Sequence, residues 1–130
     1  MACLETDFLV DLLRKKPEAI KKLEFLVKNN EKLTVTPITV TELFKGAYLS
    51  RIKEKILEIE DACMTMDILN YDFLAAKKSG EIFGNLEKEG NKIGDFDSIT
   101  GAIAVRHGEK LVTRNKKHFE KIKDLETESW

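Results

Sequence analysis

Short apolar segments alternate with longer amphipathic stretches along the whole chain. The short segments are rich in strand-forming residues and lie at residues 2–4, 33–36, 63–66, 110–113 and 125–127. The longer stretches have helical spacing and cover residues 8–14, 17–28, 40–48, 51–60, 71–88, 96–107 and 119–122. Strands separated by helices predict a mostly parallel sheet with helices on both faces. We therefore expect an α/β fold, a three-layer α/β/α sandwich with a central, mostly parallel sheet.

Capping residues mark where several of these helices begin. Thr6 or Asp7 is expected to cap the first helix, Pro17 to open the second, and Thr39 to cap the third. The apolar residues of helix 17–28 are expected on its buried side, namely Ile20, Leu23, Phe25, Leu26 and Val27. The phenylalanines are all expected in the core, which leaves no exposed aromatic platform for stacking on bases.

Length and composition limit the chain to one ordered domain, residues 1–130. Hydrophobic residues make up 42% and charged residues 35%, so a core is available and disorder is excluded. No apolar run is long enough to span a membrane, and Glu5 places an acid too early for a signal peptide. We expect a cytoplasmic protein without a membrane partner. The net charge of −1 means that binding to a phosphate backbone requires local clusters of basic residues.

Candidate chemistry gathers where the predicted strands end and the predicted helices begin. Ligands of open α/β sheets bind at the carboxyl ends of the strands. The acids and amide at such positions are Glu5, Asp7, Glu42, Asp95, Asp97 and Asn115. Neighbouring carboxylates raise each other's pKa, and a divalent cation removes that penalty. An all-oxygen set of ligands favours Mg²⁺ or Mn²⁺, and such a site suits phosphoester hydrolysis by a metal-activated water.

The same residues fall in motifs that stand in a fixed order. These are Leu4-Glu5-Thr6-Asp7-Phe8-Leu9, Thr39-Val40-Thr41-Glu42-Leu43, Ile93-Gly94-Asp95-Phe96-Asp97-Ser98-Ile99 and Leu111-Val112-Thr113-Arg114-Asn115. Together they resemble PIN-domain ribonucleases, and in particular the VapC toxins of prokaryotic toxin–antitoxin pairs. Each motif alone is weak, but all of them in register over nearly the whole chain are specific.

The resemblance implies a fold, an activity and partners. The fold is the PIN-like α/β/α sandwich, and the activity is Mg²⁺- or Mn²⁺-dependent endonucleolytic cleavage of RNA, often a structured RNA of the translation machinery. The implied partners are the RNA substrate, a second copy in a homodimer, and a cognate VapB-like antitoxin that holds the toxin inactive.

Site residues follow position by position from the matching motifs and their neighbours. Glu5, Glu42, Asp97 and Asn115 take the catalytic positions, and Glu5 and Asp97 are the expected metal ligands. Asn115 stands where many members have an acid and some have Asn. Supporting roles are expected for Thr6, Asp95 and Thr113, and RNA contacts for Arg114 and Lys116. His118 is close to these residues in sequence, but is interpreted as a structural or surface residue.

Glu5 departs from the family, which has Asp at this position. Its side chain is one methylene longer and reaches roughly 1 Å further, a displacement that can lower a rate on the order of 10²-fold. The sequence therefore predicts an attenuated enzyme or, as the alternative, a catalytically weak PIN domain that binds RNA or an antitoxin. The helices between Phe8 and Arg51 could supply an apolar surface for such a partner.

Simpler interpretations compete at individual positions. Asp95 and Asp97 could merely cap a helix, and Glu42 could be a solvated surface acid. A phosphorelay receiver domain also has an α/β sheet and an acidic Mg²⁺ pocket. That class needs a lysine after an apolar fifth strand, which is not evident, and it leaves Glu42 and Asp97 unexplained.

Overall fold

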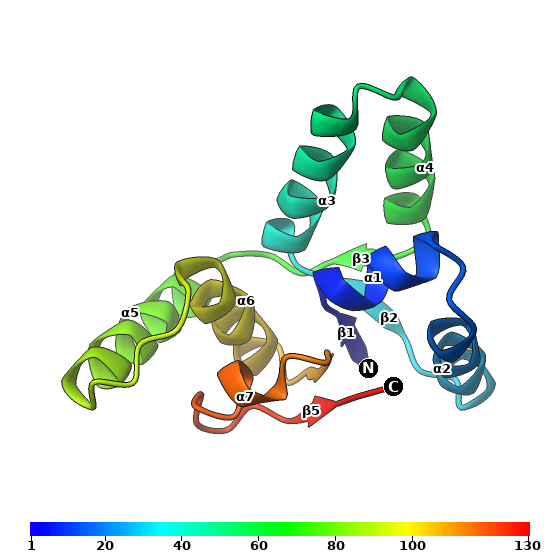
Figure 1. Ribbon diagram of the computed structural model, residues 1–130. Coiled ribbons are helices and arrows are strands. Elements are labelled where there is room, and N and C mark those ends of the chain that lie inside the picture. The colour runs from blue at the N-terminus through cyan, green and yellow to red at the C-terminus, as the bar shows by residue number, and fades with distance from the viewer.

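Parallel strands form a single sheet in the computed structural model, which describes residues 1–130 (Figure 1). The strands are β1 (Ala2–Leu4), β2 (Leu33–Val35), β3 (Asp67–Ile68), β4 (Lys110–Val112) and β5 (Thr127–Glu128). Their order is β3-β2-β1-β4-β5, and every neighbouring pair is parallel. In the middle of the sheet, Cys3 lies opposite Thr34 on one side and Leu111 on the other. The expected α/β class is confirmed.

Helices cover both faces of this sheet. They are α1 (Thr6–Leu13), α2 (Pro17–Lys28), α3 (Pro37–Ser50), α4 (Lys53–Met64), α5 (Phe73–Lys88), α6 (Asp95–Arg106) and α7 (Lys116–Phe119). Figure 1 shows α3 and α4 as a helical hairpin that projects from the sheet, with α5 and α6 packed together on the other side. None of the helices combines the length and the apolarity that crossing a membrane requires.

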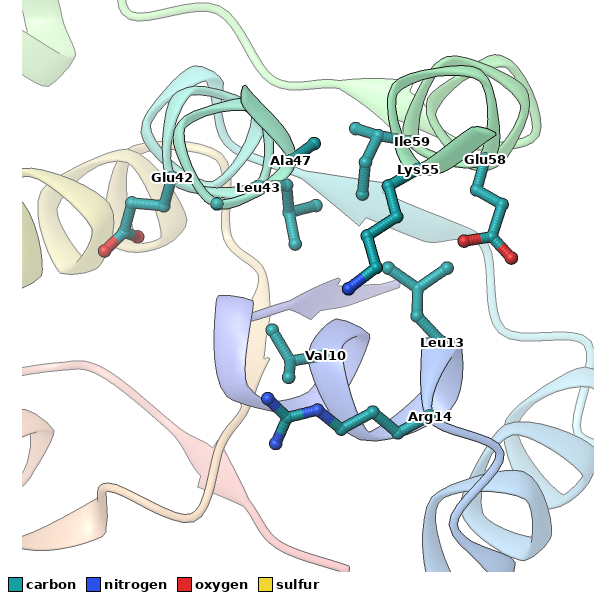
Figure 2. Close-up of a pocket in the computed structure, with 10 residues that line it drawn as sticks. Val10, Leu13, Arg14, Glu42, Leu43, Ala47, Lys55, Glu58 and Ile59 are labelled. Atoms are coloured by element: carbon teal, nitrogen blue, oxygen red, sulfur yellow. The ribbon is translucent and has the colours of Figure 1, made fainter. Parts of the chain in front are cut away.

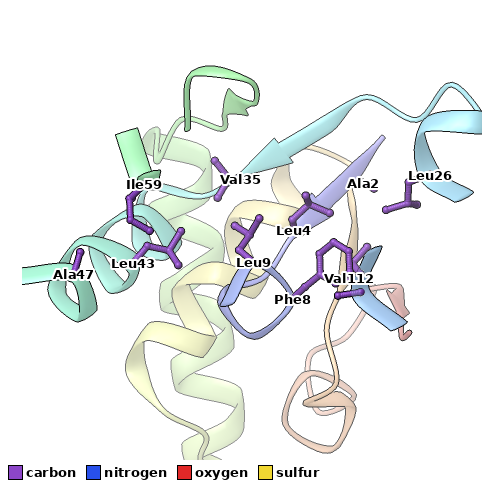
Figure 3. Packing of buried hydrophobic residues seen from close by; sticks show 11 residues of the cluster. Ala2, Leu4, Phe8, Leu9, Leu26, Val35, Leu43, Ala47, Ile59 and Val112 are labelled. Atoms are coloured by element: carbon purple, nitrogen blue, oxygen red, sulfur yellow. The ribbon is translucent and has the colours of Figure 1, made fainter. Parts of the chain in front are cut away.

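Alternation along β1 divides the core into two clusters. Ala2 and Leu4 face the first cluster, which lies under α1 to α4, whereas Cys3 faces the second, under α5 to α7. Figure 3 shows Leu4, Phe8 and Val112 meeting in the first cluster. Because successive side chains of a strand point to opposite faces, a strand buried on both sides must be apolar throughout. The central strand β1 is thus buried on both faces, and its three residues join the two halves of the core.

Two predicted caps are displaced toward the N-terminus, by one or two residues at α1 and by three at α3. The carboxylate of Glu5, and not Thr6 or Asp7, caps α1 by accepting the backbone N–H of Asp7 at 3.2 Å. The hydroxyl of Thr36, and not Thr39, caps α3 by accepting the N–H of Thr39 at 3.2 Å. In both cases the last polar residue before the helix takes the role, since an N-cap keeps extended backbone angles.

The predicted strand at residues 63–66 is wrong. Helix α4 continues through Met64, and the strand begins at Asp67. Ile56, Ile59 and Cys63 follow helical spacing. Ile59 belongs to the first core cluster and the other two pack against it, whereas Met64 is 85% exposed. A short apolar run cannot by itself distinguish a strand from the last turn of a buried helix.

The buried side of α2 is narrower than expected, and some aromatic residues are exposed. Leu26 is fully buried and Leu23 packs against the core, but Phe25 and Val27 are more than half exposed, and Ile20 lies at the edge. Phe73 and Phe96 are also exposed, at 79% and 48%, so the phenylalanines are not all core residues. A helix buries one stripe, and apolar residues outside that stripe face solvent.

Candidate active site

The carboxyl ends of β1 and β4 bring several polar side chains together. Glu5 follows β1 and Thr113 follows β4, and these strands are neighbours in the sheet. The Thr113 hydroxyl lies 3.4 Å from Glu5 Oε2 and 3.3 Å from Asp7 Oδ2, so it donates to one of these carboxylates at a time. The expected convergence of the first and last motifs is therefore present.

Glu5 is the most buried acid of this group. Its side chain is 7% exposed and serves both as the cap of α1 and as an acceptor for Thr113. Burial, followed by the hydrogen bond and the charge of Asp7 and then the charge of Asp97, raises the pKa of the Glu5 carboxyl to about 9. The folded chain thus holds Glu5 as a neutral acid at pH 7 unless a cation compensates its charge.

Asp7 belongs to the same network, in agreement with its place among the candidate acids at the strand ends. Its Oδ2 atom accepts the backbone N–H of Arg114 at 2.9 Å and lies within reach of the Thr113 hydroxyl. The sequence indicates this role of Asp7 by its position two residues after Glu5, at the same edge of the sheet. Asp7 ties the start of α1 to the loop after β4.

Asp97, at the start of α6, meets the residues that follow β4. The side-chain amide of Asn115 donates to Asp97 Oδ2 at 3.4 Å, and His118 Nδ1 lies 3.1 Å from the same oxygen. Neither contact uses Asp97 Oδ1. His118 is thus an exposed residue, as expected, and it is also in direct contact with a site acid. Its imidazole stands at the exposed rim of the site.

A second contact pair connects α1 with α3. The Thr6 hydroxyl donates to Glu42 Oε1 at 2.6 Å and lies 3.1 Å from the Thr39 hydroxyl. The predicted supporting role of Thr6 therefore has a geometric basis, since this contact orients the Glu42 carboxylate. Glu42 is partly buried, which is not the position of a freely solvated acid.

The remaining predicted site residues lie at the rim. Asp95 is exposed and makes no hydrogen bond with the other acids. Lys116 is exposed next to Asn115. Arg114 has its guanidinium on Trp130 and near Asp11, so these partners compete with the predicted RNA contact.

The donor set can be compared with what a divalent cation requires. No three His, Cys, Asp or Glu side chains are close enough to form a complete metal cage. Mg²⁺, however, is usually held by one or two carboxylates and keeps several of its waters. Glu5 and Asp97 satisfy that requirement, because both supply oxygen and the charge of Asp97 raises the pKa of Glu5. The residues present fit such an ion.

A groove of about 240 Å³ lies beside Glu42, between α1, α3 and α4 (Figure 2). Its floor is apolar, with Val10, Leu43 and Ile59, and its rim is charged. The charged residues of the rim are Arg14, Glu42, Lys55 and Glu58. Glu42 lines this groove and also accepts the hydrogen bond of Thr6, so the groove borders one of the predicted site residues.

The raised pKa of Glu5 predicts a pH-dependent stability. Glu5 is protonated in the folded chain up to about pH 9 but ionises near 4.5 when unfolded, so the folded state binds more protons between these values. The free energy of unfolding must fall as pH rises through this window. We expect the chain in EDTA to melt at a lower temperature at about pH 8.5 than at about pH 5.5. Glu5→Gln should raise the melting temperature at the higher pH by about 4 °C or more.

Thermal unfolding followed by circular dichroism measures this effect. The pKa values of the Glu31 and Glu128 carboxyls are lowered, by hydrogen bonds to Lys110 and Lys22 respectively, so they change stability only at acidic pH. An equally steep loss of stability in Glu5→Gln between the two pH values would contradict the assignment to Glu5.

The fold and the acidic edge together define a PIN domain, and comparisons with known proteins agree. The family model described as PIN domain matches residues 2–125. The chain is 32% identical to the tRNA(fMet)-specific endonuclease VapC of Shigella flexneri, over 98% of this chain and 96% of that protein. It is 35% identical, with the same coverage, to Ribonuclease VapC2 of Haemophilus influenzae. The chain belongs to the PIN-domain family and, within it, to the VapC ribonucleases.

Solved structures agree with this assignment. The VapBC2 complex of Rickettsia felis, bound to a promoter DNA fragment, contains a chain that superposes with a TM-score of 0.89 at 29% identity, covering 99% of this chain and 98% of that one. VapBC-1 from nontypeable Haemophilus influenzae gives the same TM-score at 28% identity, with 99% and 97% coverage. The arrangement of strands and helices is therefore that of chains in solved VapBC structures.

Proposed function

We propose that this chain is the toxin of a VapBC-type pair and a Mg²⁺- or Mn²⁺-dependent endoribonuclease that cleaves structured RNA. The observation that carries the proposal is that the loop after β4 contacts both expected metal ligands, Thr113 touching Glu5 and Asn115 touching Asp97. Relatives named as ribonucleases and as a tRNA-specific endonuclease support the choice of RNA, and of tRNA as the first substrate to test.

Glu5 and Asp97 would hold the cation in this proposal. A bound divalent cation would supply charge stabilisation at the phosphoryl oxygens and would acidify the attacking water. Asn115 orients Asp97 through Oδ2, which leaves Oδ1 free to act as the ligand. Thr6 holds Glu42 ready to accept a proton or orient a water. Lys116 lies exposed beside Asn115, where it can contact a phosphate of the RNA.

The antitoxin is proposed to occupy the groove between α1, α3 and α4. Its apolar floor and mixed charged rim suit an amphipathic peptide segment, with acidic groups facing Arg14 and Lys55 and basic groups facing Glu42 and Glu58. An adjoining apolar pocket of about 180 Å³ shares Leu13 and Leu43 with the groove and extends this surface. A segment that reaches Glu42 would block the site, which explains how binding can inhibit cleavage.

A second copy of the chain is proposed as the other protein partner. Ile68, Tyr71, Phe73 and Leu74 form an exposed apolar stretch from the edge strand β3 into α5. Exposed apolar residues that gather beside a sheet edge are typical of protein–protein contacts. Light scattering of the chain, alone and with its antitoxin, gives the subunit numbers, and a monomer in both samples would contradict this partner.

Cleavage of a mixed tRNA and rRNA pool tests the proposed activity. Antitoxin-free protein should produce discrete fragments with Mn²⁺ or Mg²⁺ and none with EDTA, and added Mn²⁺ should restore cleavage after chelation. Fragments that persist in EDTA would contradict the metal dependence.

The alternative, a weak PIN domain that binds RNA or antitoxin, is favoured by the burial and raised pKa of Glu5. It predicts retained binding to RNA or antitoxin without cleavage.

A further inference from the structure

The loop after β4 is in contact with three acids of the site. The Thr113 hydroxyl reaches Glu5 and Asp7, the backbone N–H of Arg114 donates to Asp7 at 2.9 Å, and Asn115 donates to Asp97. Thr113 also accepts the N–H of Asn115 at 3.0 Å, which fixes the turn between them. The position of residues 113–115 therefore decides how these acids face one another.

The side chain of Arg114 anchors this loop to the last residue of the sequence. Its Nε and Nη2 atoms donate to the main-chain oxygen of Trp130, at 3.3 and 3.2 Å. The guanidinium lies over the Trp130 ring, 4.6 Å from its centre, and Nη1 is 3.8 Å from Asp11. The Trp130 ring packs edge-on against Phe8, a fully buried residue of α1, at 4.9 Å. The contacts form a chain from α1 through Trp130 to the loop.

We propose that Arg114 and Trp130 form a clamp that positions residues 113–115 for catalysis. Both are positioning residues, because neither side chain touches the site acids Glu5, Asp7 and Asp97. The Arg114 guanidinium binds Trp130 and Asp11, so Lys116 is the residue expected to contact an RNA phosphate. The kinetic test of the clamp rests on the proposed ribonuclease function. The structural test, by hydrogen exchange, does not.

The chemistry of the two residues supports this role. A planar guanidinium can stack on an aromatic ring and donate two hydrogen bonds in its own plane, which an ammonium group cannot do. The indole N–H of Trp130 is buried without a hydrogen-bond partner, so the ring contributes through its face and edge and not through its nitrogen. Phe should therefore replace Trp130 with little loss, whereas Ala should not.

Kinetics of Arg114→Lys, Trp130→Ala and the double variant test the clamp. Each single change should lower kcat about tenfold, because the loop shifts relative to the acids. The double variant should match the singles within about twofold, since both changes break one unit. Trp130→Phe should keep kcat within about twofold of the parent. If Trp130→Ala fails to fold, Trp130→Phe and Arg114→Lys still test the clamp.

The salt dependence of KM separates positioning from RNA contact. Arg114→Lys should leave the slope of log KM against log salt unchanged, and Lys116→Ala should reduce it. Lys77→Ala, an exposed basic residue on α5, is the matched control and should change neither kcat nor slope. Independent effects that multiply in the double variant, or a reduced slope in an Arg114 variant, would overturn the clamp.

Hydrogen exchange gives a readout that needs no cleavage. The amide of Arg114, which donates to Asp7, should exchange at least about tenfold faster in Arg114→Lys and Trp130→Ala than in the parent, but not in Trp130→Phe. The sole tryptophan of the chain should also shift its emission to the red in Arg114→Lys. Unchanged exchange would overturn the clamp. A parent that cleaves no RNA would overturn the proposed function, and the exchange data would still decide the clamp.

Discussion

Asp97→Asn is expected to lower metal-dependent cleavage about 10³-fold or more while leaving the fold intact. The amide has nearly the same shape as the carboxylate and can still accept a hydrogen bond from Asn115. It lacks the negative charge that would hold a divalent cation and offset the positive charge at the reacting phosphate. Cleavage of the tRNA pool and metal binding by calorimetry should both fail, with an unchanged circular dichroism spectrum.

Asp95→Asn is the matched control for this change. Asp95 lies two residues earlier on the same helix, carries the same carboxylate, and is exposed without contact to the other acids. Asp95→Asn should keep activity within about threefold of the parent, because solvent and salt screen the exposed Asp95 charge from the site. Equal losses in the two variants would support the predicted supporting role of Asp95. Parent-level cleavage by Asp97→Asn would disprove the site assignment.

The arrangement of strands and helices could be predicted from the sequence because each βαβ unit has its own hydrophobic pattern. Parallel pairing follows from the helices between strands, and the central strand is recognisable because Ala2, Cys3 and Leu4 are all apolar. The region around Cys63 could not be predicted, because so short an apolar run fits the spacing of a helix and that of a strand equally well. Only packing against Ile56 and Ile59 shows that the helix continues.

The site could be predicted in part, for a related reason. Residues at strand ends converge by topology, so Glu5, Asp97 and Asn115 were identifiable without distances. For Asp7 the sequence leaves capping and a site role as equal alternatives, because its contact with Arg114 joins residues far apart in sequence. The partnership of Arg114 with Trp130 has no local pattern at all. Local signals identify which residues can do chemistry, and tertiary contacts decide which of them are positioned to do it.

Glu5 combines two roles that make opposite demands on its side chain. As the cap of α1 it must turn back toward the N–H of Asp7, and as a proposed metal ligand it must face Asp97. Asp is among the best N-cap residues and, being shorter, keeps its carboxylate close to the backbone. The Asp that the resemblance to VapC toxins implies at this position would therefore serve both roles with a shorter side chain.

On the hypothesis that the longer Glu5 misplaces its carboxylate, Glu5→Asp is expected to raise kcat by about tenfold, and at most on the order of 10²-fold. The cap on α1 should survive, so the melting temperature should change little. Initial rates of tRNA cleavage at saturating Mn²⁺ measure the effect, because saturation separates a better-placed ligand from tighter metal binding.

Glu42→Asp supplies the matched comparison, since it removes the same methylene from another acid of the site. There the shorter side chain withdraws from the Thr6 hydroxyl, which now lies 2.6 Å from Glu42 Oε1, so activity should fall. A gain at position 5 with a loss at position 42 would show that the chain length of each acid is matched to its place. Equal or lower activity in Glu5→Asp would mean that the surrounding residues, Asp7 and Thr113 first among them, have adapted to the longer acid. Glu5 would then be a native ligand of this site, and the attenuation hypothesis would be wrong.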